Sequence, residues 1–136
     1  MIDINKIKVR GYHIDSYGHV NNTRYLEFLE ETRWILKDKY FQYFDGHHKE
    51  YGLVVVNNTI DYYAPAFLGE ILKIETSILK IGTKSVQFLH KMVNDETNQL
   101  ITSTKATFVF FNHKKNISEK IPEKLIKNFK ILTNNM

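Results

Sequence analysis

A long stretch of helical spacing constrains this chain more than any other feature. Between Asn22 and about Tyr40, apolar or small side chains recur every three or four residues, which places them on one face of a helix. These positions are Tyr25, Phe28, Leu29, Thr32, Ile35 and Leu36. A helix of this length spans about 28 Å at a rise of 1.5 Å per residue, long enough to cross a whole sheet. The sequence therefore predicts one helix that needs a broad apolar partner.

Strand-like runs supply that partner. Residues 3–10 alternate weakly, as a first strand would, and four longer runs follow the helix: Leu53–Tyr63, Glu70–Ile81, Lys84–Asn94 and Leu100–Phe111. In the second run, apolar residues and Thr76 alternate with polar residues, which predicts one buried and one wetter face. This order favours an α+β fold in which an antiparallel five-stranded sheet wraps around one long helix. Periodicity leaves open whether the strands pair as sequence neighbours or by crossing over.

The remaining segments predict connections within one domain over residues 1–136. Phe41–Gly52 is aromatic and polar, and is interpreted as an irregular connection or a short second helix. The segments at 82–83 and 95–99 are plausible hairpin loops. Ile117–Phe129 is interpreted as a closing turn or a helix opened by Pro122. A hydrophobic content of 43% indicates a folded globule. The absence of cysteine excludes disulfides, thiolate nucleophiles and cysteine zinc sites.

The segment before the helix concentrates the residues that could carry chemistry. Asp15 lies in a turn-forming stretch, and Asn21 and Asn22 are good helix caps because their side-chain oxygens accept from first-turn amides. The helix start also offers free backbone N–H groups and a positive dipole end to a ligand oxygen. A carboxylate beside such amides can attack a carbonyl carbon while the amides hold the developing oxyanion.

This segment also resembles a known family signature. The pattern is Asp15-x-x-Gly-His-Val-Asn-Asn-x-x-Tyr25, followed by Glu30-x-x-Arg33. It is similar to the signature of hot-dog-fold acyl-CoA thioesterases of the 4-hydroxybenzoyl-CoA thioesterase type. Further likeness follows downstream, in Asp-Tyr-Tyr-x-Pro at 61–65, Gly-Glu at 69–70 and Ile-Gly-x-Lys-Ser at 81–85. The resemblance covers roughly residues 6–122, nearly the whole chain.

The resemblance implies an enzyme of lipid metabolism that hydrolyses acyl-CoA thioesters to a free acid and coenzyme A. Asp15 would be the nucleophile or the base that activates water, and the amides of Asn22 and Thr23 would be the oxyanion donors. His19 would orient the acid, assist proton transfer or bond a main-chain carbonyl. No cofactor or metal is implied. Such proteins join two sheets edge to edge, so a homodimer or homotetramer with sites at the subunit interface is expected.

The same resemblance implies a set of substrate-binding residues. Gly18 lets the turn approach a ligand closely. Lysine and serine after a glycine turn could meet a pantetheine arm or a phosphate, and the mildly basic net charge of +4 suits an anionic substrate. The predicted substrate-binding residues are Tyr17, Gly18, Tyr25, Tyr63, Lys84 and Ser85.

Several alternatives stay open or are disfavoured. An acyl-carrier-protein thioesterase and a non-catalytic acyl-CoA or lipid-binding module remain open. The glutamates of the helix, Glu27, Glu30 and Glu31, fall off the apolar stripe, which disfavours the branch with a helix glutamate. The chain lacks the histidine-glycine-proline pattern of hot-dog dehydratases, which disfavours that class. It also lacks Gly-x-Ser-x-Gly, which excludes a serine-hydrolase elbow. Scattered lysines predict no nucleic-acid partner.

The compartment is also an expectation from the sequence. No apolar run approaches membrane-spanning length, and the first residues lack the apolar stretch of a signal peptide. We therefore expect a cytoplasmic protein without membrane insertion.

Overall fold

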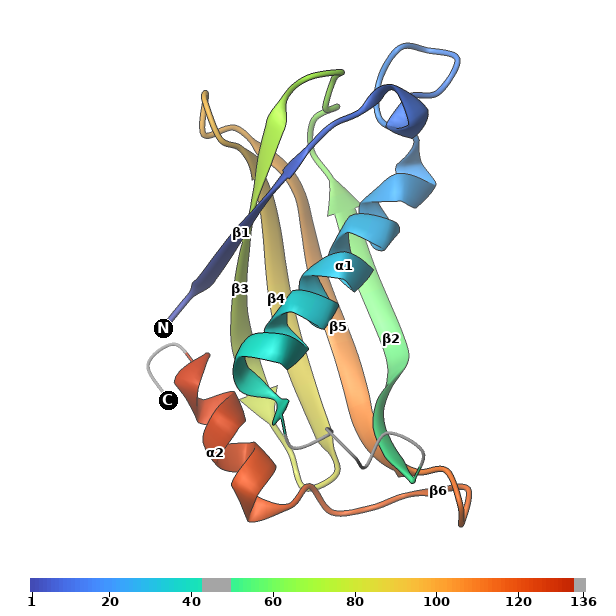
Figure 1. Ribbon diagram of the computed structural model, residues 1–136, viewed down its shortest axis with the longest axis vertical. Coiled ribbons are helices and arrows are strands. Elements are labelled where there is room, and N and C mark those ends of the chain that lie inside the picture. Colours follow the sequence, from blue (N-terminus) through green and yellow to red (C-terminus); the bar gives the residue numbers. More distant parts are fainter. Residues whose placement is uncertain (43–49, 134–136) are drawn as a thin grey trace.

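The computed structural model describes residues 1–42 and 50–133, and consists of one sheet with a long helix across one face (Figure 1). The elements in chain order are β1 (Asp3–Lys8), the 3-10 helix η1 (Gly11–His13), α1 (Asn22–Tyr40), β2 (Tyr51–Tyr62), β3 (Ile71–Ile81), β4 (Ser85–Asn94), β5 (Leu100–Asn112), β6 (Ile117–Ser118) and α2 (Glu123–Ile131). The predicted α+β architecture is confirmed. Most of the connection predicted over Phe41–Gly52 lies outside the described residues.

The strands cross over rather than pairing in sequence order. The sheet runs β1-β3-β4-β5-β2, and every pair in it is antiparallel. Thus β2, which follows α1 in the chain, does not pair with its sequence neighbour β3 but with β5, at the edge of the sheet. A sixth strand, β6, pairs with the end of β5 after a turn in which Asn116 has a φ of 58°. Its two residues are too few to show a period, so the predicted count of five was one short.

Helix α1 begins and ends as its periodicity predicts. Asn21 is the N-cap, and the buried face consists of Tyr25, Phe28, Leu29, Thr32 and Leu36. The Thr32 hydroxyl donates to the carbonyl oxygen of Phe28 at 2.8 Å, which satisfies a polar group on this otherwise apolar stripe. None of the described helices is long and apolar enough to cross a membrane.

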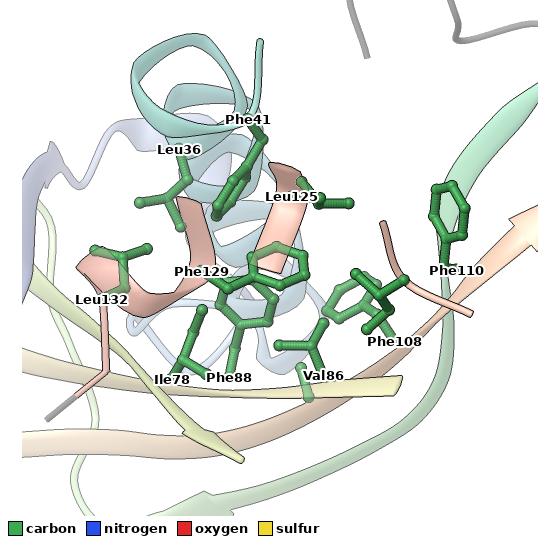
Figure 2. Close-up of a cluster of buried hydrophobic side chains, with 12 residues drawn as sticks. Leu36, Phe41, Ile78, Val86, Phe88, Phe108, Phe110, Leu125, Phe129 and Leu132 are labelled. Carbon is green, nitrogen blue, oxygen red and sulfur yellow. The ribbon is translucent and has the colours of Figure 1, made fainter. Parts of the chain in front are cut away.

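The C-terminal helix α2 closes one end of the sheet over an apolar cluster. Pro122 precedes it as the N-cap residue, as expected for the helical alternative. Phe129 lies at the centre of the cluster, with ring centroids 5.1 Å from Phe41 and 6.2 Å from Phe88 (Figure 2). The buried members of the cluster are Leu36, Phe41, Ile78, Val86, Phe88, Ala106, Phe108, Phe110, Ile121, Leu125, Phe129 and Leu132. Burial of these side chains fixes α2, since a nine-residue helix is not stable alone.

A second apolar cluster packs beneath the N-terminal half of α1. Its buried members are Val9, Val20, Tyr25, Phe28, Leu29, Ala66, Leu72, Ile74, Met92 and Ile101. These residues come from α1, the sheet, the segment between β1 and α1, and the segment that follows β2. The cluster therefore holds the Asp15 segment against the end of β2.

A row of polar side chains crosses the sheet between the two clusters. In the strand register Asp3 lies opposite Thr76, Thr76 opposite His90, and His90 opposite Thr104. All four are buried, and His90 Nδ1 lies 2.8 Å from Thr76 Oγ1. At the outer end of the row, Asp3 Oδ1 accepts from Tyr40 Oη at 2.8 Å. The core is thus two apolar halves joined by a polar layer.

The buried His90 predicts a loss of stability in acid. Burial lowers its pKa from 6.5 to about 3, and the charge of Arg33 acts in the same direction. Between these values the unfolded chain binds a proton that the folded protein does not. The free energy of unfolding should therefore fall by about 1.4 kcal/mol per pH unit as the pH drops below 6.5 toward 3. Urea unfolding of the wild type and His90→Gln at pH 7 and pH 5 measures this, and an equal loss in both proteins contradicts it.

Candidate active site

Asp15 lies in a tight turn between η1 and α1. Ile14 and Val20 form an antiparallel bridge, and the Asp15 N–H donates to the His19 carbonyl oxygen at 2.9 Å. Gly18 closes the turn with a φ of 87°, in the region that favours glycine. The predicted role of Gly18 as a conformationally special turn residue is therefore consistent with its backbone.

The Asp15 carboxylate is held at one oxygen by the backbone and faces His19 with the other. Oδ1 accepts from the Tyr17 backbone N–H at 2.9 Å, while Oδ2 lies 3.5 Å from His19 Nδ1. The side chain is 21% exposed, so it is shielded but reachable. The His19 ring is stacked beside Tyr17, with the centroids 6.0 Å apart. The turn thus brings a carboxylate, an imidazole and a phenol close together.

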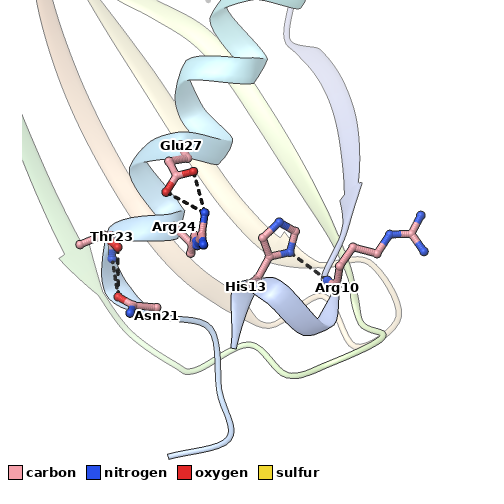
Figure 3. Close-up of polar contacts among 6 residues, drawn as sticks. All are labelled: Arg10, His13, Asn21, Thr23, Arg24 and Glu27. Carbon is pink, nitrogen blue, oxygen red and sulfur yellow. Dashed lines mark hydrogen bonds and ion pairs between the residues drawn. The ribbon is translucent and has the colours of Figure 1, made fainter. Parts of the chain in front are cut away.

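Within the described part of the chain, the start of α1 has one backbone N–H free to bind a ligand, that of Asn22, because the Thr23 N–H is bonded to the Asn21 side chain. Asn21 Oδ1 accepts from both the backbone N–H and the hydroxyl of Thr23, each at 3.1 Å (Figure 3). Of the two predicted caps, Asn21 is therefore the one that acts. The neighbouring Asn22 N–H donates to no group among the described residues. Of the two predicted oxyanion donors, Asn22 is the one whose amide is not engaged by the cap.

A cavity of about 550 Å³ opens where this turn meets the end of β2. Its walls come from the turn, the first residues of α1, the end of β2 and the segment that follows. The lining residues are Asp15, Tyr17, His19, Val20, Asn22, Tyr25, Tyr62, Tyr63, Ala64 and Pro65. Six residues predicted for catalysis or binding are in this lining: Asp15, Tyr17, His19, Asn22, Tyr25 and Tyr63. The structure thus brings predicted residues of the Asp15 segment and α1 together with Tyr63, which follows β2.

Two predicted binding residues lie elsewhere. Lys84 is in the turn between β3 and β4, and Ser85 begins β4. This turn is at the end of the sheet near α2, whereas the Asp15 turn is at the opposite end (Figure 1). Within one chain, Lys84 and Ser85 are therefore remote from the cavity.

Tyr25 ties the two walls of the cavity together. Its hydroxyl accepts from the Ala66 N–H at 3.2 Å, and its ring lies 5.7 Å from that of Tyr62. The Val20 N–H in turn donates to the Ala66 carbonyl oxygen at 2.9 Å. Burial raises the pKa of Tyr25, so the hydroxyl stays protonated near neutral pH. Tyr25 thus has a structural contact that the sequence pattern did not reveal.

His13 is a supporting residue that sequence reasoning missed. It is buried beside α1, and its Nδ1 accepts from the Arg10 N–H at 2.8 Å (Figure 3). Its ring meets that of Phe28 edge to face, at 4.7 Å between centroids. Burial lowers the pKa of His13, and the charge of Arg24 lowers it further. The lowered pKa favours the neutral ring, which can accept the hydrogen bond from Arg10. A single histidine without periodic context gives no signal for such a role.

The site combines a fixed carboxylate, an unengaged helix amide and aromatic walls. A carboxylate can act as a nucleophile or a general base, and an amide can stabilise an oxyanion. The described residues contain no group of three histidine, aspartate or glutamate side chains placed to hold a metal ion. The arrangement is therefore suited to attack on an acyl carbon whose apolar substituent enters the cavity.

Comparison with known proteins places this geometry in context. The family model described as "Thioesterase-like superfamily" matches residues 9–129. The chain is 41% identical over 106 residues to the long-chain acyl-CoA thioesterase FadM of Escherichia coli strain K12, covering 76% of this chain and 79% of FadM. It is 30% identical over 117 residues to the acyl-CoA thioester hydrolase YbgC of Escherichia coli O6:H1, covering 85% and 87%. The crystal structure of YbaW, a probable thioesterase from Escherichia coli, superposes with a TM-score of 0.85 at 34% identity, covering 96% of this chain and 98% of YbaW.

Proposed function

Because the chain belongs to the thioesterase-like superfamily and has its hot-dog fold, we propose that it hydrolyses acyl-CoA thioesters to a free acid and coenzyme A. The observation that carries this proposal is that the Asp15 carboxylate and Asn22, whose amide is unengaged, line the same aromatic cavity. FadM and YbgC, which are named for this reaction, support the substrate class.

Asp15 is the central group of the proposed mechanism. As a base, it removes a proton from water while the water oxygen bonds to the thioester carbonyl carbon. As a nucleophile, its own oxygen makes that bond, and water then cleaves the resulting anhydride. In both routes the carbon–sulfur bond breaks, the thiolate of coenzyme A leaves and takes up a proton, and the free acid remains.

The Asn22 N–H stabilises the oxyanion that forms when the carbonyl is attacked. It lies at the start of α1, where the helix dipole adds to its partial positive charge. The Thr23 N–H can join it only by giving up its bond to Asn21. His19, 3.5 Å from Asp15, orients the carboxylate or carries the transferred proton.

The reaction is tested by release of free thiol from a panel of acetyl-, hexanoyl-, palmitoyl- and benzoyl-CoA. We expect release with at least one of these substrates and a rank order that reports the depth of the cavity. Acyl carrier protein charged with the same acids forms a second panel, because that substrate class is the close alternative. No release from either panel contradicts the proposed function, and ligand-induced stabilisation without release indicates a binding module.

The free edge of β2 supports a dimer as part of the proposed function. In the described sheet β2 pairs with β5 on one side, and its other edge lies along solvent over 12 residues. Val55 and Val56 at mid-strand are 43% and 57% exposed. Proteins cover long apolar edges of this kind. We propose that two copies pair their β2 edges antiparallel about a two-fold axis.

Such a pairing bears on the remote residues Lys84 and Ser85. Antiparallel pairing puts the start of one β2 beside the end of the other, where Tyr62 lines the cavity. The sheet end that holds Lys84 of the partner subunit then lies at the same end of the joined sheet as the Asp15 turn. A role for Lys84 and Ser85 in binding substrate is therefore a role across subunits.

The interface is tested by charging the middle of the edge. Val56→Lys should convert a dimer to a monomer, because the variant brings like charges together at the pairing edge. Light scattering after size-exclusion chromatography measures the mass. Ile4→Lys is the matched control, since Ile4 is 49% exposed on the opposite edge strand β1. A monomeric wild type, or a Val56→Lys protein with unchanged mass, contradicts this interface.

A further inference from the structure

The polar row in the core ends at Thr104 on β5, two residues from Thr102, which pairs with a residue of the cavity wall. Tyr62, which lines the cavity, lies directly opposite Thr102 in the β2–β5 register, and Ile60 lies opposite Thr104. Residues directly opposite in an antiparallel pair share a face of the sheet. Thr102 is therefore behind the cavity wall, and Thr104 is about 7 Å deeper along β5 at two residues of strand rise.

Four polar groups in this part of the core have no hydrogen-bond partner among the described residues. They are Thr102 Oγ1, Thr104 Oγ1, His90 Nε2 and Arg33 Nη1, and each of these atoms is fully buried. The two threonines and His90 are 0% exposed as whole residues. Native proteins leave few buried polar atoms unpaired, so a group of four in one layer calls for a partner.

Arg33 brings a positive charge to the same layer. Its guanidinium carbon lies 5.1 Å from the centre of the Phe108 ring, on β5 beyond Thr104. The charge of Arg33 lowers the pKa of His90, in addition to the larger effect of burial. Burial lowers the pKa of Arg33, and the charge of Glu30 acts in the opposite direction. Nη1 of Arg33 is buried without a hydrogen-bond partner among the residues that the structure describes, and such a donor favours a nearby acceptor oxygen.

The chemistry of the four groups selects one kind of partner. Arg33 can only donate, and the threonine hydroxyls can donate to a ligand oxygen. His90 Nε2 can do the same when its Nδ1 accepts from Thr76. A hydrocarbon chain lying here leaves all four groups unpaired, whereas a chain with an oxygen at this depth pairs them.

We propose that this layer is the far end of the acyl site and binds an oxygen function, a hydroxyl, keto or carboxylate group, on a long acyl chain. The inference rests on the proposed function, because it identifies the acyl group of the same thioester. The depth sets the length: Arg33 lies about 16 Å along α1 from Asn22 at 1.5 Å per residue. A short acyl group does not reach the layer.

The test compares substrates of equal length. The kcat/KM of the wild type is measured for 12-hydroxydodecanoyl-CoA and dodecanoyl-CoA, and we expect the hydroxylated substrate to be preferred at least tenfold. In Thr104→Val, which keeps the shape and removes the hydroxyl, the ratio should fall toward one. Thr107→Val is the matched control, since Thr107 is on the outer face of the same strand and should keep the wild-type ratio. Equal rates in the wild type, or a ratio unchanged by Thr104→Val, overturn the inference.

A binding readout separates this inference from the proposed function. The shift in melting temperature is measured with 12-hydroxydodecanoic acid and with dodecanoic acid. A larger shift with the hydroxy acid in the wild type, but not in Thr104→Val, supports the polar end even if no thioester is cleaved. Equal shifts overturn it even if both thioesters are cleaved. Without ligand, Thr104→Val should be at least as stable as the wild type, since it removes an unpaired hydroxyl. A lower stability contradicts an unpaired Thr104 hydroxyl and also overturns the proposal.

Discussion

Replacing Asp15 with asparagine is expected to lower kcat for acyl-CoA hydrolysis by about a thousandfold. The amide keeps an oxygen that can accept from the Tyr17 N–H, so the turn that now holds Oδ1 at 2.9 Å should keep its shape. The negative charge and the basic lone pair are lost, and with them both the nucleophile and the general base. Thiol release under saturating substrate measures kcat, and KM should change little.

Asp61→Asn is the matched control for this variant. Asp61 is an exposed aspartate near the end of β2, one residue before the cavity wall begins at Tyr62. The Asp61→Asn variant removes the same charge close to the site without changing a residue that lines the cavity, so its kcat should stay near that of the wild type. Urea unfolding of both variants shows whether either has lost its fold. Wild-type turnover by a folded Asp15→Asn protein would remove Asp15 from the mechanism.

Phe129→Ala is expected to reduce the free energy of unfolding by about 3–5 kcal/mol. Phe129 is 0% exposed and packs between Phe41 and Phe88, so truncation leaves a cavity beneath α2. A loss of this size is a large part of the stability of an ordinary domain. Chemical denaturation of the wild type and the variant measures the difference.

Phe129→Leu tests whether the loss comes from the cavity. It keeps an apolar side chain of intermediate size, so its loss should lie between those of the wild type and the alanine variant. Lys130→Ala, at the exposed neighbouring position of α2, should change stability little. A Phe129→Ala protein within the range of Lys130→Ala would show that α2 does not contribute to global stability.

The helix was the part of the fold most accessible from sequence. Both bounds of α1 follow from local information, a cap at Asn21 and an apolar stripe that continues to the last turn. The strands were found for the same reason, since alternation in β3 leaves Leu72, Ile74 and Thr76 on the buried face. Period alone identifies a face.

Period does not identify a neighbour. The pairing of β2 with β5 depends on how the sheet closes around α1, which no single strand encodes. Strand β6 escaped prediction because two residues have no period, and its pairing depends on the turn at Asn116.

The site divides along the same line. Asp15, Tyr17, His19 and Asn22 are close in sequence and line one cavity, because one turn and one helix start hold them. The engagement of the Thr23 amide by Asn21 was not foreseen, since either asparagine could have capped the helix. Lys84 and Ser85 belong to a different sequence pattern from Asp15 and lie at the opposite end of the sheet, so their predicted role in binding requires the partner subunit.

The polar layer was invisible in the sequence for a geometric reason. Thr76, His90 and Thr104 come from three different strands and become neighbours only through register. Each alone reads as an ordinary strand residue.

The crossover of β2 also sets an order of events during synthesis of the chain. The Asp15 turn, α1 and β2 are made early, but β2 has no sheet neighbour until β5 has been made, about fifty residues after the end of β2. Closing so long a loop makes this a slow, non-local step. In a chain arrested on the ribosome before Leu100, the end of β2 should therefore have no strand to hold it opposite Asp15, and the cavity should form only as β5 emerges. The cavity should therefore be complete only after more than two thirds of the chain has been translated. Until then the apolar edge of β2 is exposed to other chains.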